Sequence, residues 1–104
     1  MVLVNILSND VKQIEEITVK LLHLKLIATA NIDHNRERIE IINGQVHKRT
    51  VNLLTCTTKA LLFETINNFL KDNYPNNLPE LYSTAIVHMD WSLSKFLAES
   101  TEKV

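Results

Sequence analysis

The sequence predicts an α+β fold in which a four-stranded antiparallel sheet carries two helices on one face. Three observations lead to this prediction. Strand patterns and helix patterns alternate along the chain, an Asn-Gly pair joins two long strand patterns, and both prolines separate a helix pattern from a strand pattern. The predicted order is strand, helix, strand, strand, helix, strand and a terminal helix. This is the split βαβ, or ferredoxin-like, arrangement.

The first strand and the first helix are predicted over residues 2–24. Residues 2–7 are a short apolar run, which is typical of a buried strand. Ser8, Asn9 and Asp10 are all candidates for the N-cap of the helix that follows. In residues 11–24 the apolar side chains recur at helical spacing with charged side chains between them, so this segment is predicted to be an amphipathic helix.

The middle of the chain is predicted to be a long hairpin. Residues 26–32 are almost continuously apolar, as in a central strand, and residues 33–38 are a polar connection or an exposed extension of that strand. Asn43-Gly44 is the strongest hairpin signal, because both central positions of a type I′ turn need positive φ. Residues 45–55 alternate as the returning strand. We expect the hairpin of residues 39–56 to be longer than the sheet of one domain can cover.

A second helix, a fourth strand and a last helix complete the pattern. Thr57 or Thr58 is the expected cap of the second helix. Its predicted buried stripe consists of Leu61, Leu62, Ile66, Phe69 and Leu70. Pro75 and Pro79 end this helix after about Asn73 and lead the chain, extended, into a strand over residues 80–88.

The last helix is expected to begin at a cap formed by Asp90 or Ser92. Its inward side chains are predicted to be Leu93, Phe96 and Leu97. We expect Trp91, beside the cap, to seal the edge of the sheet.

Composition excludes several classes of function. The length of 104 residues fits one domain over residues 1–104. The formal net charge of -1 argues against a nucleic-acid binder. Its apolar segments are too short to span a membrane. One cysteine, Cys56, fits a reducing cytoplasm, and we expect it to be a small buried hydrophobe instead of a reactive thiol. One glycine, Gly44, rules out a glycine-rich phosphate loop.

The predicted sheet has a second face that no helix covers. We expect this face to be as apolar as the helix-facing one, since residues 26–32 and 53–54 offer hydrophobic side chains to both sides. A second apolar face has to be buried against another chain. The sequence therefore predicts an oligomer.

Four segments resemble the CutA family of divalent-cation tolerance proteins. Residues 74–81 read Tyr-Pro-Asn-Asn-Leu-Pro-Glu-Leu, where the family has His-Pro-Tyr-x-x-Pro-Glu-Ile/Leu. Residues 28–32 resemble its Ala-Cys-x-Asn-Ile strand, and residues 43–45 stand where Trp-Glu-Gly-Lys makes its hairpin turn. Residues 96–101 are similar to its terminal Trp-Ile/Leu-x-Glu-Ser-Thr. The order and spacing of these segments, over essentially the whole chain, carry the resemblance.

The resemblance implies a homotrimer in which the long hairpin reaches a neighbouring subunit. It implies a non-enzymatic role in divalent metal-ion tolerance or response, in the cytoplasm. It also implies a likeness to the PII-like signalling proteins, which bind small molecules between subunits. The alternative function is therefore a PII-like or ACT-like sensor with a ligand held between subunits.

The metal site of the family does not transfer to this sequence. The copper ligands of some members are a cysteine in the first strand and histidines before the Pro-Tyr pair. The resemblance places Ile6, Asn73 and Tyr74 at these positions, and none of the three is a normal copper ligand. The hairpin tryptophan and the motif tyrosine of the family are also replaced, near Ile42 and by Asn76. We expect no cofactor, and a divalent metal remains the less favoured alternative.

Candidate ligand-binding residues surround the proline segment and the hairpin. They are Tyr74, Asn76, Glu80, Arg36 and Arg49. Four of them have a structural alternative: Tyr74 as a packed aromatic with a bonded hydroxyl, Glu80 as a partner of backbone N–H groups or an arginine, and the two arginines as members of ion pairs between subunits.

Catalytic and metal-binding patterns are weak. The histidines, His23, His34, His47 and His88, lack metal-motif spacing, although His34 and His47 could face each other across the hairpin. An acylphosphatase on the same fold needs glycines and an arginine after the first strand, and residues 8–10 contain neither. An RNA-recognition domain needs paired aromatics on the central strands, which this sequence lacks. No catalytic residue is assigned.

Overall fold

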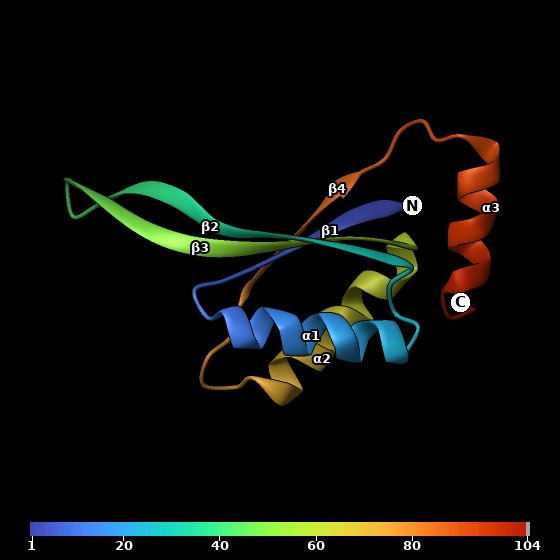
Figure 1. Ribbon diagram of the computed structural model, residues 1–104, viewed down its shortest axis with the longest axis horizontal. Helices are drawn as coiled ribbons and strands as arrows, with labels where there is room; N and C mark the ends of the chain where they lie inside the picture. The colour runs from blue at the N-terminus through green and yellow to red at the C-terminus, as the bar shows by residue number, and fades with distance from the viewer. Residues whose placement is uncertain (104) are drawn as a thin grey trace.

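The computed structural model describes residues 1–103, and its order of elements is the predicted one (Figure 1). The strands are β1 (Val2–Ser8), β2 (Thr29–Ile42), β3 (Gln45–Thr58) and β4 (Glu80–Ala85). The helices are α1 (Val11–His23), α2 (Phe63–Asn73) and α3 (Trp91–Ser100), with a short 3-10 helix, η1 (Ala60–Leu62), before α2. The predicted ferredoxin-like α+β fold is confirmed.

One antiparallel sheet with the strand order β2-β3-β1-β4 organises the molecule. Figure 1 shows α1 and α2 side by side on one face of this sheet and α3 at one end of the molecule. The β2–β3 hairpin projects beyond the sheet at the opposite end, and the molecule measures 46 × 29 × 20 Å. Hence the hairpin makes the molecule elongated.

The main core lies between the sheet and its two helices. In the β1–β3 ladder, Val4 is opposite Cys56 and Ile6 is opposite Leu54, and all four side chains are fully buried. The helices complete this core with Ile14, Ile17, Leu21, Ile66 and Leu70. Fully burying such a side chain stabilises a fold by about 1.5–3 kcal/mol. The core therefore holds α1 and α2 on this face.

The opposite face of the sheet contradicts the prediction that it is equally apolar. Side chains alternate across a strand, so Leu3, Asn5 and Leu7 of β1 point to this face and share it with their β3 partners. Polar residues occupy much of it, namely Thr29, Asn31, Thr55, Thr57 and Thr84. Its apolar part is a small cluster of Leu7, Val51 and Leu53. The prediction from the apolar runs is wrong because alternate positions in the paired strands, which point to the open face, are Asn or Thr.

The hairpin turn and its exposed extension are confirmed. The prediction of a central strand over residues 26–32 is wrong, because β2 begins at Thr29 and lies at an edge of the sheet. Asn43 and Gly44 both have positive φ, 53° and 77°, as a type I′ turn requires. β2 is one strand as far as Ile42, with a bulge between Asp33 and Arg36 where Asn35 has φ 57°. We call residues 36–50, beyond the bulge, the arm.

The predicted threonine cap of α2 is wrong. Thr57 and Thr58 continue β3, because β-branched residues suit a strand and Thr58 pairs with Val2 in the ladder. The Thr58 hydroxyl donates to the carbonyl of Leu26 at 2.6 Å. η1 precedes α2, neither has a side-chain cap within the described residues, and Leu61 is 73% exposed instead of buried.

The C-terminal region is less packed than predicted. β4 ends at Ala85, before the predicted residue 88. Asp90 does cap α3, accepting from the N–H of Leu93 at 3.2 Å. Of the three residues predicted to point inward, only Leu97 is buried, and Trp91, at 77% exposure, does not seal the sheet edge. The reason is that α3 lies at the end of the molecule, where one line of side chains touches the rest.

Candidate functional site

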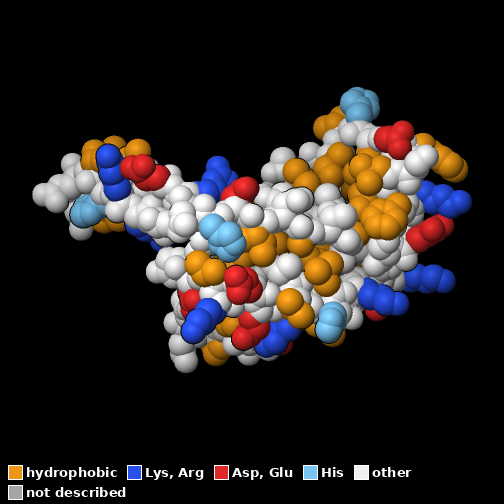
Figure 2. Space-filling model, in the orientation of Figure 1, with side chains coloured by type: hydrophobic (Ala, Val, Ile, Leu, Met, Phe, Trp, Pro, Cys, Tyr) orange, Lys and Arg blue, Asp and Glu red, His pale blue; other side chains and the backbone are white. Residues whose placement is uncertain are grey.

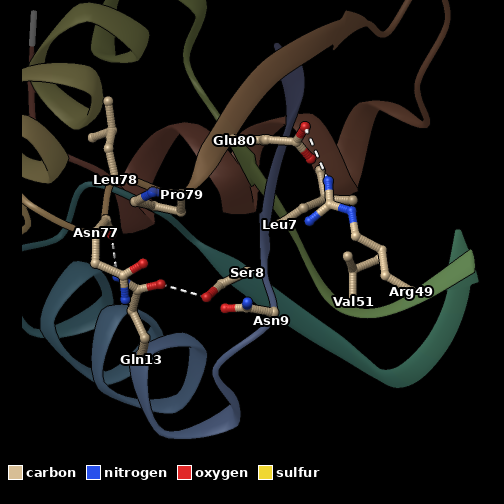
Figure 3. A pocket seen from close by; sticks show the side chains of 10 residues that line it. All are labelled: Leu7, Ser8, Asn9, Gln13, Arg49, Val51, Asn77, Leu78, Pro79 and Glu80. Carbon is tan, nitrogen blue, oxygen red and sulfur yellow. Dashed lines mark hydrogen bonds and ion pairs between the residues drawn. The ribbon is translucent and has the colours of Figure 1, made fainter. Parts of the chain in front are cut away.

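A polar recess lies where the β1–α1 junction, the proline segment and the base of the arm meet (Figure 3). Its volume is about 150 Å³. It is lined by Leu7, Ser8, Asn9, Gln13, Arg49, Val51, Asn77, Leu78, Pro79 and Glu80. Segments distant in the sequence therefore supply one site.

One wall of the recess is made of amide and hydroxyl groups. The Ser8 hydroxyl donates to Oε1 of Gln13, and Nε2 of Gln13 donates to the carbonyl of Asn77 at 2.6 Å. Gln13 is only 5% exposed, although it is polar. Asp10 caps α1, accepting from the N–H groups of Lys12 and Gln13, which places Gln13 in the first turn. The Gln13 side chain is thus fixed at both ends and joins the helix start to the proline segment.

The opposite wall is charged. Nε and Nη2 of Arg49 donate to Oε1 of Glu40 at 3.1 and 2.9 Å. Oε2 of Glu80 accepts a hydrogen bond from Nη1 of Arg38. Oε1 of Glu80 is 3.9 Å from Nη2 of Arg49, which is an ion-pair distance but too long for a hydrogen bond. Figure 3 shows this pair facing the recess.

The charged wall belongs to a network of two cations and two anions. Arg38 and Arg49 are directly opposite in the β2–β3 ladder, where like charges repel. Glu40 and Glu80 relieve this repulsion, because Glu40 contacts both arginines and Glu80 contacts both as well. The hydrogen bond from Glu80 raises the pKa of Arg38 above its usual range. The network is neutral and links the arm to β4.

The structure brings two of the five candidate ligand-binding residues together. Arg49 and Glu80 both line the recess. Arg36 lines a neighbouring hollow with Leu7, Val51 and Tyr82. Arg49, expected to form ion pairs between subunits, forms them within this chain with Glu40 and Glu80. Arg36 forms no ion pair with another residue in the range 1–103.

The other two candidates do not line the recess. The Tyr74 hydroxyl donates to Oε1 of Glu16 at 2.6 Å, and Lys20 also contacts that carboxylate at 3.0 Å. Partial burial and this hydrogen bond raise the pKa of Tyr74, and the same hydrogen bond lowers the pKa of Glu16. Tyr74 therefore joins α2 to α1 as a packed aromatic with a bonded hydroxyl. Asn76 is exposed in the proline segment.

Gln13 is the residue of the recess that sequence reasoning missed. Glutamine is polar and its neighbours are charged, so the pattern predicts the wet face of the helix for it. The signal that could have found it is the Asp10-x-x-Gln13 spacing, which matches a capping box and turns the N3 side chain back toward the helix start.

The histidines and the cysteine do not gather into a metal site in the described part of the chain. Within residues 1–103, no three His, Cys, Asp or Glu side chains are placed to hold one ion. His47 is opposite Glu40 in the ladder and His34 is at the bulge, so the expectation that these two histidines face each other is wrong. Cys56 is buried, and loss of solvation raises the pKa of its thiol to about 12.

A second, larger groove lies over the helices. Its volume is about 470 Å³, and Leu24, Leu26 and Phe69 form much of its surface. No cationic side chain of residues 1–103 lines it, and it is wide open. Polar side chains of Thr65, Asn68, Asp72, Asn73 and Glu102 also line it. The smaller recess is the stronger candidate site, because it is more enclosed and presents both a cation and an anion. Separately, no helix within residues 1–103 is long and apolar enough to cross a membrane.

Comparisons with known proteins agree on one family. The family model described as CutA1 divalent ion tolerance protein matches residues 2–100. CutA1 from Oryza sativa is similar in structure with a TM-score of 0.87 at 20% identity, over 99% of this chain and 94% of that one. CutA1 from Pyrococcus horikoshii gives 0.85 at 21% identity, over 99% and 100%.

Two further comparisons complete the set. The divalent cation tolerance protein from Thermus thermophilus gives a TM-score of 0.85 at 23% identity, over 98% of this chain and 100% of that one. A search of curated protein sequences gives no match. Similarity to solved structures at these sequence identities supports the fold of this chain. The match to the CutA1 family model supports its family. Because that model spans residues 2–100, the chain belongs to the CutA1 divalent ion tolerance family.

Proposed function

We propose that the chain works as a non-enzymatic homotrimer in the cellular response to divalent metal ions. Membership of the CutA1 divalent ion tolerance family supports the metal-ion response. The observation that carries the assembly is the arm, which leaves the sheet with large apolar side chains in solvent. These are Ile39, Ile41, Ile42 and Val46.

A second apolar surface lies at the other end of the molecule. Val87, Trp91, Leu93 and Phe96, on and before α3, are all exposed. Figure 2 shows hydrophobic side chains at the end of the arm and again near α3, at opposite ends of this face. Two different surfaces on one chain favour head-to-tail contacts, which give a closed ring when the rotation closes. A ring of three is what the family resemblance implies.

Light scattering on the purified chain tests the assembly. Three protomers of 12.0 kDa give about 36 kDa. We expect Ile41→Asp to lower this mass toward one protomer, because a charge would replace an apolar contact at the arm. Lys48→Gln on the same arm is the control and should keep the mass. A wild-type mass of one protomer at micromolar concentration would contradict the proposal.

The proposed response does not use the copper ligands of the family. Ile6, at the position of the family cysteine, is fully buried in the core. We expect titration with Cu(II), Zn(II) and Ni(II), followed by metal analysis, to show no stoichiometric uptake. Uptake of one ion per protomer or per trimer would overturn this part of the proposal and leave the assembly untouched.

A small-molecule sensor is the second candidate function. The observation that favours it is the Arg49–Glu80 pair, which faces a polar recess without forming a hydrogen bond. A ligand that binds only the folded state raises the melting temperature. A thermal-shift screen with nucleotides, amino acids and divalent metals tests this function, and no shift in any class would contradict it.

A further inference from the structure

We propose that the recess binds a small polar α-amino acid, with its carboxylate on Arg49 and its ammonium group on Glu80. This inference rests on the sensor function proposed above and names its ligand. It follows from the size of the recess, from the two charges on one wall and from the amide groups on the other (Figure 3).

The size of the recess favours a small ligand. Its volume of about 150 Å³ is below the range of about 300–1,000 Å³ that is usual for pockets of drug-sized ligands, so most of a nucleotide would lie outside it. An amino acid with a short side chain does fit.

The charged wall favours a ligand that carries both signs of charge. Arg49 uses Nε and Nη2 for Glu40, and its Nη1 donates no hydrogen bond to any group of residues 1–103. Oε1 of Glu80 likewise accepts none within those residues and faces Arg49 at 3.9 Å. A carboxylate on Arg49 and an ammonium group on Glu80 would satisfy both. A simple anion would be repelled by Glu80, and a simple cation by Arg49.

The amide wall favours a polar side chain on that ligand. One N–H of Gln13 is committed to the carbonyl of Asn77, which leaves the second amide hydrogen available. The side chain of Asn9 also lines the recess. Because Gln13 is held at both ends and is almost fully buried, it is a preformed partner. Hydroxyl or amide side chains, as in serine and asparagine, match these groups.

Isothermal titration of the full chain with L-serine and L-asparagine tests the inference. We expect each protomer to bind one ligand molecule, and we expect binding to saturate at ligand concentrations of up to about 10 mM. Serinamide lacks the carboxylate of serine and 3-hydroxypropanoate lacks only its ammonium group, so each should bind at least about tenfold more weakly. These analogues test both charges on the unaltered protein. No binding of either amino acid, or equal binding of an analogue, would overturn the inference.

Two variants locate the binding. Arg49→Gln and Glu80→Gln should each weaken binding about tenfold. Lys48→Gln is the matched control, because neighbouring side chains on a strand point to opposite faces and Lys48 pairs with Glu37 at 3.6 Å. Circular dichroism and light scattering check folding and assembly. Equal weakening by Lys48→Gln, or unchanged binding in both recess variants, would place the ligand elsewhere and overturn the inference.

Different results would contradict the sensor function and the amino-acid ligand. If the thermal-shift screen responds to a nucleotide or a metal but titration shows no amino-acid binding, the named ligand is wrong and the sensor function stands. If no class of ligand binds, both fail. If amino acids bind but the protein is a monomer, the trimer is wrong and the recess stands.

Discussion

The two ends of the β2–β3 hairpin differ in burial although the same two strands form both. At the base, residues 51–54 of β3 are all buried, whereas residues 45–50 in the arm are all exposed. The ladder continues through both regions, with Ile32 opposite Leu54 at the base and Ile41 opposite Val46 in the arm. At the base, α1 and α2 cover Leu54 on one face, and Val51 and Leu53 cluster with Leu7 on the other. Backbone pairing also forms the arm, but the large apolar side chains of the arm stay exposed among residues 1–103.

A hydrogen-bonded joint, formed by Ser8, Asn35 and Asn52, separates these two regions. The N–H of Asn35, at the bulge, donates to Oδ1 of Asn52 at 3.2 Å, and Nδ2 of Asn52 donates to the carbonyl of Ser8 at 3.2 Å. Asn52 is almost fully buried. One side chain therefore ties β1, β2 and β3 together at the point where cover by the helices ends.

Leu54→Ala is expected to have the largest effect, because it opens a cavity in the covered base. Leu54 is fully buried between the sheet and the helices. Leucine-to-alanine changes at such sites cost about 2–5 kcal/mol of unfolding free energy. Denaturation in guanidinium chloride measures this loss. A loss below about 1 kcal/mol would mean that the base is not the stable region.

High pH should destabilise the base through Cys56. The folded state raises the pKa of the thiol from 9.0 to about 12, so the folded protein holds this proton more tightly than the unfolded chain does. Stability is therefore complete below pH 9 and falls as pH rises from 9 to about 12, by at most about 4 kcal/mol.

Cys56→Val is the control for this pH dependence, since it keeps an apolar group and removes the thiol. Denaturation curves across the same pH range should be flatter for this variant. Some loss above pH 10 should persist, because the pKa of Tyr74 is also raised from 10.0. Equal slopes for the variant and the wild type would contradict the burial of the thiol as the cause.

Asn52→Ala should have a smaller effect, confined to the joint. It leaves the N–H of Asn35 and the carbonyl of Ser8 without their side-chain partner. Losing such a partner costs about 1–3 kcal/mol. Hydrogen exchange should show faster exchange at Asn35 than in the wild type while the core amides keep their order of protection. Uniformly faster exchange would mean that the joint and the base unfold together.

Ile41→Ser should have the smallest effect on the protomer itself. Ile41 is 76% exposed, so the free energy of unfolding of the dissociated protomer should change by no more than about 0.5 kcal/mol. Far-ultraviolet circular dichroism in dilute solution should be unchanged. A large loss of strand signal would show that the arm takes part in the protomer core and does not differ from the base in this respect.

Local signals predicted most of the fold. The Asn43-Gly44 turn was predicted directly, and the α1 cap was narrowed to Ser8, Asn9 or Asp10, because each feature depends on the conformation of a few consecutive residues. The proline segment ended α2 at Asn73, as predicted. For the recess, the sequence pointed to Arg49 and Glu80 but not to Gln13. That residue is buried by contact with Ser8 and Asn77, and the second of these lies 64 positions away.

The residue pattern was enough to predict the order of strands and helices, the Asn43-Gly44 turn and the family. It also narrowed the caps of α1 and α3 to a few candidates, which include Asp10 and Asp90. These features depend on periodicity and on backbone preferences within short windows, which the residues carry wherever the chain lies. Packing between distant segments fixed four further features: Thr58 stays in β3, the open face is half polar, Trp91 is exposed, and Arg49 and Glu80 share a recess. Each of these depends on which distant segment packs against the residue, and long-range packing is not encoded in local spacing.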